Sequence, residues 1–282
     1  MIPRAYVTAW RAKVPWPDDA QVEQDLVLSR ALVEMFKNTL IQEALAFRGG
    51  TALHKLFFEQ PRRYSEDIDL VQKEAGPIGP VLDAMRTTLD PWLGEPRHSR
   101  GWGRVKLQYR FDTTTLPVRS MRLKIEINTR VHIAVMGFIG RKLRVDNPWF
   151  SEETAITVYE LEELLATKLR ALYQRKKGRD LYDLWLALES GRHELGDEQI
   201  VQCFLRYMDY GQTPVSRAQF ERNIADKLAD STFLEDIEPL LPSNAAYDPQ
   251  AAAEVVLSRL VARIPGDPWK GSESPGQERS NE

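Results

Sequence analysis

The sequence has little cysteine and no long apolar run. Cys203 is the single cysteine among 282 residues, which excludes an internal disulfide framework and suits a reducing compartment. No His or Cys cluster surrounds it, so a buried thiol is favoured over a reactive one. Residues 1–10 lack the basic start and apolar stretch of a secretion signal. No stretch approaches the roughly 20 apolar residues that a membrane span needs. These absences predict a cytoplasmic protein with no membrane partner.

The composition is that of a folded globular protein. Hydrophobic residues make up 43% of the chain and charged residues 28%, and seven tryptophans argue for well-packed interiors rather than disorder. A chain of 282 residues can form one large domain or two of ordinary size.

The charge is unevenly distributed along the chain. The net charge of −3 by itself argues weakly against a nucleic-acid partner. Between Arg97 and Arg144, however, twelve basic residues stand against Asp112 and Glu126, a net of +10 in 48 residues. A second stretch, 168–179, carries six basic residues and no acid. Local basic surface of this kind attracts polyphosphates and nucleic acids.

The hydrophobic patterns predict an α/β N-terminal half and an all-helical C-terminal half. A long helix is predicted from Asp18 or Asp19 to about residue 45. Alternation of apolar and polar residues predicts strands over 67–71, 104–111 and 121–128. After Pro148 only helices are predicted, over 160–175, 180–189, 197–208, 217–228 and 249–263. We therefore place domains at 1–150 and 151–265, followed by a loose polar tail at 266–282.

The most informative stretch holds a glycine pair followed by an Asp-x-Asp pair. Gly49 and Gly50 leave backbone N–H groups free to approach a ligand, and a helix capped by Thr51 is expected to follow. Asp67 and Asp69 are two residues apart on a predicted strand, so both carboxylates project from one face. Adjacent carboxylates repel one another and favour a divalent cation. A loop for a triphosphate beside a carboxylate pair for Mg²⁺ is what in-line nucleotidyl transfer requires.

A third acid would complete a two-metal site, and Glu126 is the best candidate. It lies on a predicted strand whose polar face also bears Lys124 and Asn128. Asp112 and Asp146 are alternatives, but neither lies inside a strand with this alternation. Each element alone is more simply explained as a turn, a solvated edge or the wet face of a strand. Together and in this order they favour a catalytic site.

A second polar group lies in the predicted helical half. Lys168 and Arg175 share one face of a helix that Gly178 can end, and the next helix begins near Asp180. A helical hairpin can then return Asp183 towards Lys168. In that arrangement Lys168 neutralises charge that develops on a phosphate, and Asp183 orients it. A basic, solvated helix face with capping aspartates is the alternative, and both interpretations stay open.

At these positions the sequence resembles the AbiEii/AbiGii-type nucleotidyltransferase toxins, including the MenT group, of the polymerase-β-like nucleotidyltransferase superfamily. The likeness covers roughly residues 5–190. The matching elements are Gly49-Gly50-Thr51, Arg63-x-Ser65-x-Asp67-x-Asp69, Lys124-x-Glu126, and Lys168 with Arg175, Arg179-Asp180 and Asp183. The superfamily often has Gly-Ser where this chain has Gly-Gly-Thr, so a Thr51 hydroxyl would serve instead.

The resemblance implies a fold, a reaction and partners. It implies a mixed-sheet nucleotidyltransferase domain followed by an all-helical domain, and a toxin of a toxin–antitoxin or phage-defence pair. Such a toxin uses Mg²⁺ and an NTP, modifies the 3′ acceptor end of tRNA, blocks aminoacylation and growth, and has a cognate antitoxin protein encoded alongside.

Pattern and resemblance together assign the site residues. The catalytic residues are then Asp67, Asp69, Lys168 and Asp183. The nucleotide is held by Gly49, Gly50, Thr51, Ser65, Lys168, Arg175 and Arg179, and the metal by Asp67, Asp69 and Glu126. Two other functions stay open: transfer of a nucleotide to a protein side chain, and a non-catalytic module that binds GTP or an antitoxin. The intact Asp67 and Asp69 speak against the second of these.

Overall fold

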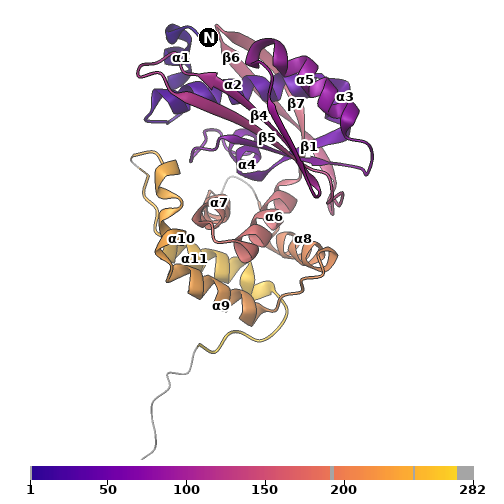
Figure 1. Ribbon diagram of the computed structural model, residues 1–282. Helices are drawn as coiled ribbons and strands as arrows, with labels where there is room; N and C mark the ends of the chain where they lie inside the picture. Colours follow the sequence, from indigo (N-terminus) through magenta and orange to yellow (C-terminus); the bar gives the residue numbers. More distant parts are fainter. Residues whose placement is uncertain (1, 191–193, 244, 272–282) are drawn as a thin grey trace, which may run out of the picture. The chain divides into compact units, whose positions relative to one another are not determined.

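A computed structural model describes residues 2–190, 194–243 and 245–271 (Figure 1). The described chain divides into two compact units. One contains residues 2–167, 238–243 and 245–246, and the other contains residues 168–190, 194–237 and 247–271. The division falls inside helix α6 (Leu161–Gln174). The tail predicted for 266–282 lies outside the described residues from position 272 onwards.

The first unit is built on a seven-stranded mixed sheet with the order β3-β4-β5-β2-β1-β7-β6. Its strands are β1 (Leu45–Arg48), β2 (Asp67–Gln72), β3 (Arg97–Gly101), β4 (Arg104–Asp112), β5 (Ser120–Asn128), β6 (Phe138–Asn147) and β7 (Phe150–Tyr159). The pairs β2–β5 and β1–β7 are parallel and the others are antiparallel. The α/β class predicted for this half is confirmed, and β7 carries the sheet beyond residue 150, where the sequence predicts the domain boundary.

The helices of this unit precede or connect the strands. They are α1 (Arg4–Arg11), α2 (Asp19–Lys37), α3 (Thr39–Ala44), α4 (Gly49–Leu56) and α5 (Gly79–Leu93), with a 3-10 turn at Glu238–Leu240. The single helix predicted from residue 18 or 19 to about 45 is wrong in one respect, because it is broken at Asn38. That residue is extended, and its side chain accepts a hydrogen bond from the Ile41 N–H, which starts a new helix.

At β4 and β5 the sheet has one apolar face and one polar face. On β4 the residues Val105, Leu107 and Tyr109 are buried, and the Tyr109 hydroxyl donates to Asp90 of α5 (2.8 Å). The apolar face of the sheet therefore packs against helices, and α2 also lies against β5, β6 and β7. The alternate residues of β2, β4 and β5 project from the opposite, polar face. Asp67 and Asp69 belong to that polar face because they pair in register with its β5 residues.

The second unit contains helices only, as far as the structure describes it. After α6 come α7 (Gly178–Glu189), α8 (Asp197–Tyr210), α9 (Arg217–Leu228), α10 (Ser231–Glu235) and α11 (Pro249–Arg259), with a 3-10 turn at Val261–Arg263. The helical character predicted for the C-terminal part is confirmed from α6 onwards. The prediction of helices alone after Pro148 is wrong, because residues 150–159 form β7, which pairs with β6. Cys203 of α8 is 3% exposed, which fits the predicted buried thiol.

Candidate active site

The two aspartates of the Asp-x-Asp pair project from β2 towards the polar residues of β5. Asp67 lies opposite Lys124, and Asp69 lies opposite Glu126. The Lys124 ammonium is 2.9 Å from Asp67 Oδ2 and 3.4 Å from Glu126 Oε2. Burial alone would lower the pKa of Lys124, but these carboxylates outweigh it and raise that pKa. The sheet thus gathers acids on two neighbouring strands, and one ammonium compensates part of their charge.

Asp69 is packed against the glycine that begins α4. Gly49 has φ of +80°, and a Cβ placed on it would lie 2.5 Å from Asp69 Oδ2. Arg48, the residue before it, pairs with Asp69 across β1 and β2. Burial raises the pKa of Asp69, and the positive charge of Arg48 opposes that shift. Glycine is therefore needed here both for its backbone conformation and for the close approach of the carboxylate.

We expect Gly49→Ala to lower activity by about 10²-fold, because a displacement of a catalytic group by about 1 Å has an effect of that size. Gly94→Ala is the matched control: Gly94 has φ of +76° but nothing within 4 Å of an added Cβ. Both variants carry backbone strain of about 1–2 kcal/mol, whereas only the first displaces Asp69. Steady-state transfer rates and urea melts measure the two effects. Equal rates in the two variants would contradict a role for the contact with Asp69.

Thr51 links the glycine loop to the Asp-x-Asp strand. Its hydroxyl donates to the Asp67 carbonyl (2.6 Å) and is 2.6 Å from the Ser65 hydroxyl. Because Thr51 has a single hydroxyl proton, Ser65 donates to Thr51. The prediction that Thr51 caps the helix that follows the glycines is wrong, since α4 begins at Gly49 and the Thr51 hydroxyl bonds to the Asp67 carbonyl of β2 instead. Thr51 and Ser65 thereby hold the start of β2 against the segment that carries Gly49 and Gly50.

The three acids proposed as metal ligands are not equally placed. Glu126 is opposite Asp69 but forms ion pairs with Arg104 (3.5 Å) and Lys124. Among residues 2–190, 194–243 and 245–271, no group of three or more His, Cys, Asp or Glu side chains has the arrangement of a metal site. Of the alternative third acids, Asp146 is paired with Lys13 (3.0 Å) on β6, at the edge of the sheet.

The strand register sorts the basic residues of the 97–144 run onto two faces. Residues opposite one another on neighbouring strands share a face. On β3, β4 and β5, the basic residues on the same face as Asp67 and Asp69 are Arg97, Arg104, Lys106, Arg110, Arg122 and Lys124. Arg100 is paired with Val105 and projects from the other face. The acids on the polar face of the sheet therefore lie among basic residues.

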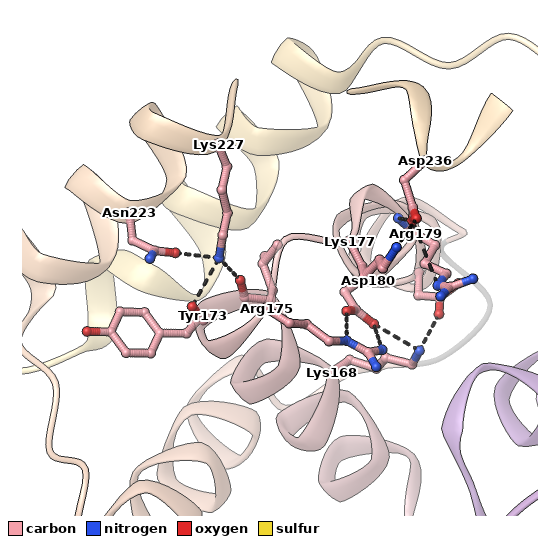
Figure 2. A network of polar contacts seen from close by, with 11 residues as sticks. Lys168, Tyr173, Arg175, Lys177, Arg179, Asp180, Asn223, Lys227 and Asp236 are labelled. Atoms are coloured by element: carbon pink, nitrogen blue, oxygen red, sulfur yellow. Dashed lines mark hydrogen bonds and ion pairs between the residues drawn. The ribbon is translucent and has the colours of Figure 1, made fainter. Parts of the chain in front are cut away.

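Lys168 occupies a buried ion-pair network in the helical unit (Figure 2). Its ammonium is 2.7 Å from Asp183 Oδ2 and 3.2 Å from Asp180 Oδ1. The Arg175 guanidinium adds two hydrogen bonds to Asp180, of 2.7 and 2.9 Å. The Lys168 side chain is 6% exposed and both aspartates are fully buried. The predicted return of Asp183 to Lys168 is confirmed, and the alternative of a solvated face does not hold for Lys168.

Burial and charge act in opposite directions within this network. Burial alone would raise the pKa of Asp180, but Lys168 and Arg175 outweigh it and hold that pKa below its usual range. The prediction that Gly178 ends the first helix is wrong, because Gly178 is the first residue of α7. A Cβ on Gly178 would lie 2.2 Å from the Phe233 carbonyl oxygen, so the close approach of α10 requires glycine here.

The other basic residues of this region bind groups of their own unit. Arg179 Nε is 3.7 Å from Asp236 Oδ2. Lys227 is buried and donates to the last carbonyls of α6, including that of Tyr173 (3.0 Å), and to Asn223 Oδ1 (2.6 Å) (Figure 2). Burial lowers the pKa of Lys227 to about 8. Lys227, which the sequence patterns do not single out, thus stabilises the C-terminal end of the helix that carries Lys168.

A family model matches the chain over both units. The model of the nucleotidyl transferase AbiEii toxins of type IV toxin–antitoxin systems matches residues 30–255, which is most of the chain. This chain belongs to the AbiEii nucleotidyl transferase toxin family. The predicted family is confirmed. An AbiEii-family protein is an enzyme with a nucleotide substrate and has an antitoxin partner.

Solved structures share the fold of this AbiEii-family protein at low sequence identity. The nucleotidyltransferase toxin MenT4 of Mycobacterium tuberculosis is 19% identical, with a TM-score of 0.66 over 94% of this chain and 91% of that one. JHP933 of Helicobacter pylori is 18% identical, with a TM-score of 0.56 over 86% and 92% of the two chains. A search of curated protein sequences gives no match. These likenesses concern the fold.

Among the described residues of this AbiEii-family protein, no helix is long and apolar enough to cross a membrane. Nucleotidyltransferases of this kind generally use a divalent metal.

Proposed function

We propose that this AbiEii-family toxin transfers a nucleotide from an NTP, bound with Mg²⁺, to RNA, with the 3′ acceptor end of tRNA as its acceptor. The observation that carries the proposal is the contact between the Gly49 loop and the Asp69 carboxylate, with Asp67 on the same face of β2. It sets backbone N–H groups at the start of α4 beside a carboxylate pair. A polyphosphate and a hard cation are recognised by such groups in combination.

The donor set fits magnesium. Mg²⁺ in phosphoryl-transfer sites is held by one or two carboxylates together with phosphate oxygens and water. Asp67 and Asp69 supply two such carboxylates, and the Asp67 side chain is 37% exposed and so open to a ligand. We assign Glu126 as the third ligand, which requires it to leave Arg104 and Lys124. When bound, the metal neutralises charge on the triphosphate; the protein's own groups position the phosphates and the acceptor.

The basic face of the sheet favours RNA over a protein acceptor. Six basic residues of β3, β4 and β5 share the face of the aspartates, and RNA affinity depends strongly on phosphate contacts. If RNA is the acceptor, we expect the reaction to take place in the cytoplasm. We also expect it to cause loss of translation and growth. A protein side chain as acceptor, or GTP binding without chemistry, would not need this charge distribution.

Purified protein incubated with each labelled NTP, Mg²⁺ and total RNA tests the proposal. We expect label in RNA of tRNA size, and none with Asp67→Ala. Label in protein instead of RNA would favour the alternative acceptor. Nucleotide binding without transfer of label to any macromolecule would favour the non-catalytic module.

We expect the face of the sheet, more than the number of charges, to govern RNA binding. Arg97 and Arg100 are both exposed residues of β3, but only Arg97 shares the face of the aspartates. Arg97→Gln should reduce the slope of log K against log salt by about 0.7 to 0.9, whereas Arg100→Gln should leave it unchanged. NTP binding should be the same in both. Equal slopes in the two variants would argue against this face as the RNA surface.

A further inference from the structure

Trp102 is a large aromatic residue at the turn between β3 and β4. It is 84% exposed, although tryptophan is usually well buried. The guanidinium carbon of Arg130 lies 3.9 Å from the centroid of its ring, in a cation–π contact. With so much of the residue exposed, the ring offers surface that Arg130 does not cover. The packing of the sheet does not account for this placement.

The backbone holds this pair in position. Gly103 follows Trp102 with φ of +72°, and a Cβ on it would lie 2.8 Å from the Arg130 Cβ. The Thr129 N–H donates to the Gly103 carbonyl (3.0 Å), and the Arg130 N–H donates to Asn128 Oδ1 (2.9 Å). The β3–β4 turn and the segment that follows β5 are therefore fixed to each other. The Trp102–Arg130 pair is organised before any ligand binds.

The pair lies at one end of the basic face that carries the aspartates. Arg104 begins β4 beside the turn and reaches Glu126 (3.5 Å), and Glu126 is opposite Asp69. A rise of about 3.3 Å per residue and a strand spacing of about 4.8 Å put the ring on the order of 15 Å from Asp69. This separation suits a strand of a few nucleotides that runs from the turn to the carboxylates.

We propose that Trp102 and Arg130 form a stacking platform for an unpaired base of the RNA acceptor strand. The inference rests on the proposed RNA nucleotidyl transfer and identifies where the strand next to the reacting end is held. Aromatic faces with neighbouring arginines bind single-stranded nucleic acid by stacking and charge together. A protein-docking residue would be expected among apolar neighbours. The neighbours of Trp102 along the chain are Gly101 and Gly103, flanked by arginines.

Binding of a labelled single-stranded oligonucleotide, and of a duplex of equal length, tests the platform. We expect Trp102→Leu to weaken single-strand binding by about 5- to 150-fold and duplex binding much less. The salt slope should not change, because no charge is removed, and Trp102→Phe should keep most of the affinity. The KM for RNA should rise while the KM for NTP stays the same. Leu116→Ala is the matched control, since Leu116 is 85% exposed in the β4–β5 connection, and it should bind like the wild type.

The outcomes separate this inference from the function on which it rests. If the wild-type protein labels no RNA, the proposed function fails and the platform fails with it. If the wild type labels RNA and Trp102→Leu binds and labels RNA equally well, only the platform is overturned. Normal RNA binding combined with escape of Trp102→Leu from the antitoxin would make Trp102 a protein contact, and would also overturn the platform.

Discussion

Asp67→Ala and Asp69→Ala are each expected to abolish nucleotide transfer and toxicity while the protein stays folded. Each variant removes one of the two carboxylates that β2 presents on the polar face, so the rate should fall by at least 10²- to 10³-fold. The fold should persist because removal of one acid relieves repulsion from the others. In Asp67→Ala, the Lys124 ammonium keeps Glu126 at 3.4 Å as a partner. Thermal melts and transfer assays with Mg²⁺ or EDTA measure both effects.

Two further variants test which other acids belong to this site. Glu126→Gln should also lose most activity; if it does not, Glu126 is not the third ligand, although the Asp67–Asp69 pair can stand. Asp112→Ala is a control, because Asp112 is an exposed acid at the end of β4, opposite Ser120. It should retain the wild-type rate. Wild-type activity of Asp67→Ala or Asp69→Ala, or full activity of the unmodified protein in EDTA, would refute the site.

Lys168→Ala is expected to lower both the activity and the stability of the protein. Removal of Lys168 leaves the fully buried Asp183 without the ammonium that lies 2.7 Å away. Breaking a buried pair in this way lowers the free energy of unfolding by about 3–5 kcal/mol. The loss of a preorganised charge should lower the rate by about 10²-fold or more. Lys168→Arg should not fully restore either property, because a planar guanidinium does not replace a compact ammonium held between Asp180 and Asp183.

A double variant distinguishes a catalytic role of Lys168 from a structural one. In Lys168→Met combined with Asp183→Asn, position 183 carries no charge, and Asp180 keeps its two hydrogen bonds from Arg175. We expect most of the stability lost in Lys168→Met alone to return, as happens when buried ion pairs are replaced as a whole. The rate should stay low if the ammonium acts on a phosphate. A double variant with the wild-type rate would make the role of Lys168 purely structural.

Local patterns predicted those elements in which apolar and polar residues follow the regular period of a strand or a helix. The strands β4 and β5 alternate apolar and polar residues, and α9 was predicted at its observed bounds, 217–228. The strands β3, β6 and β7 were not predicted. All five residues of β3 are exposed, so its sequence has no alternation of buried and exposed residues. Such strands are stabilised by pairing with residues that are distant in the chain, which a local pattern does not record.

The sequence predicted the residues of the candidate site but not the contacts between them. The spacing of Asp67 and Asp69 placed both carboxylates on one strand face, because side chains alternate along any strand. The opposition of Asp69 and Glu126 depends on the register of two parallel strands that are far apart in sequence. The ion pairs that Lys124 and Arg104 make with these acids follow from the same register. No single-strand pattern specifies them.

The sequence by itself determined the family, the α/β-then-helical order of the chain and the candidate site residues, because these depend on short spacings and periodicities. Only the tertiary structure decided the burial of Lys168 between two aspartates, the separation of Arg97 from Arg100 onto different faces, and the contact of Gly49 with Asp69. Burial, register and close approach are properties of segments that meet across long stretches of chain. They arise when the sheet and helices pack, and the same residues in another register would present different faces.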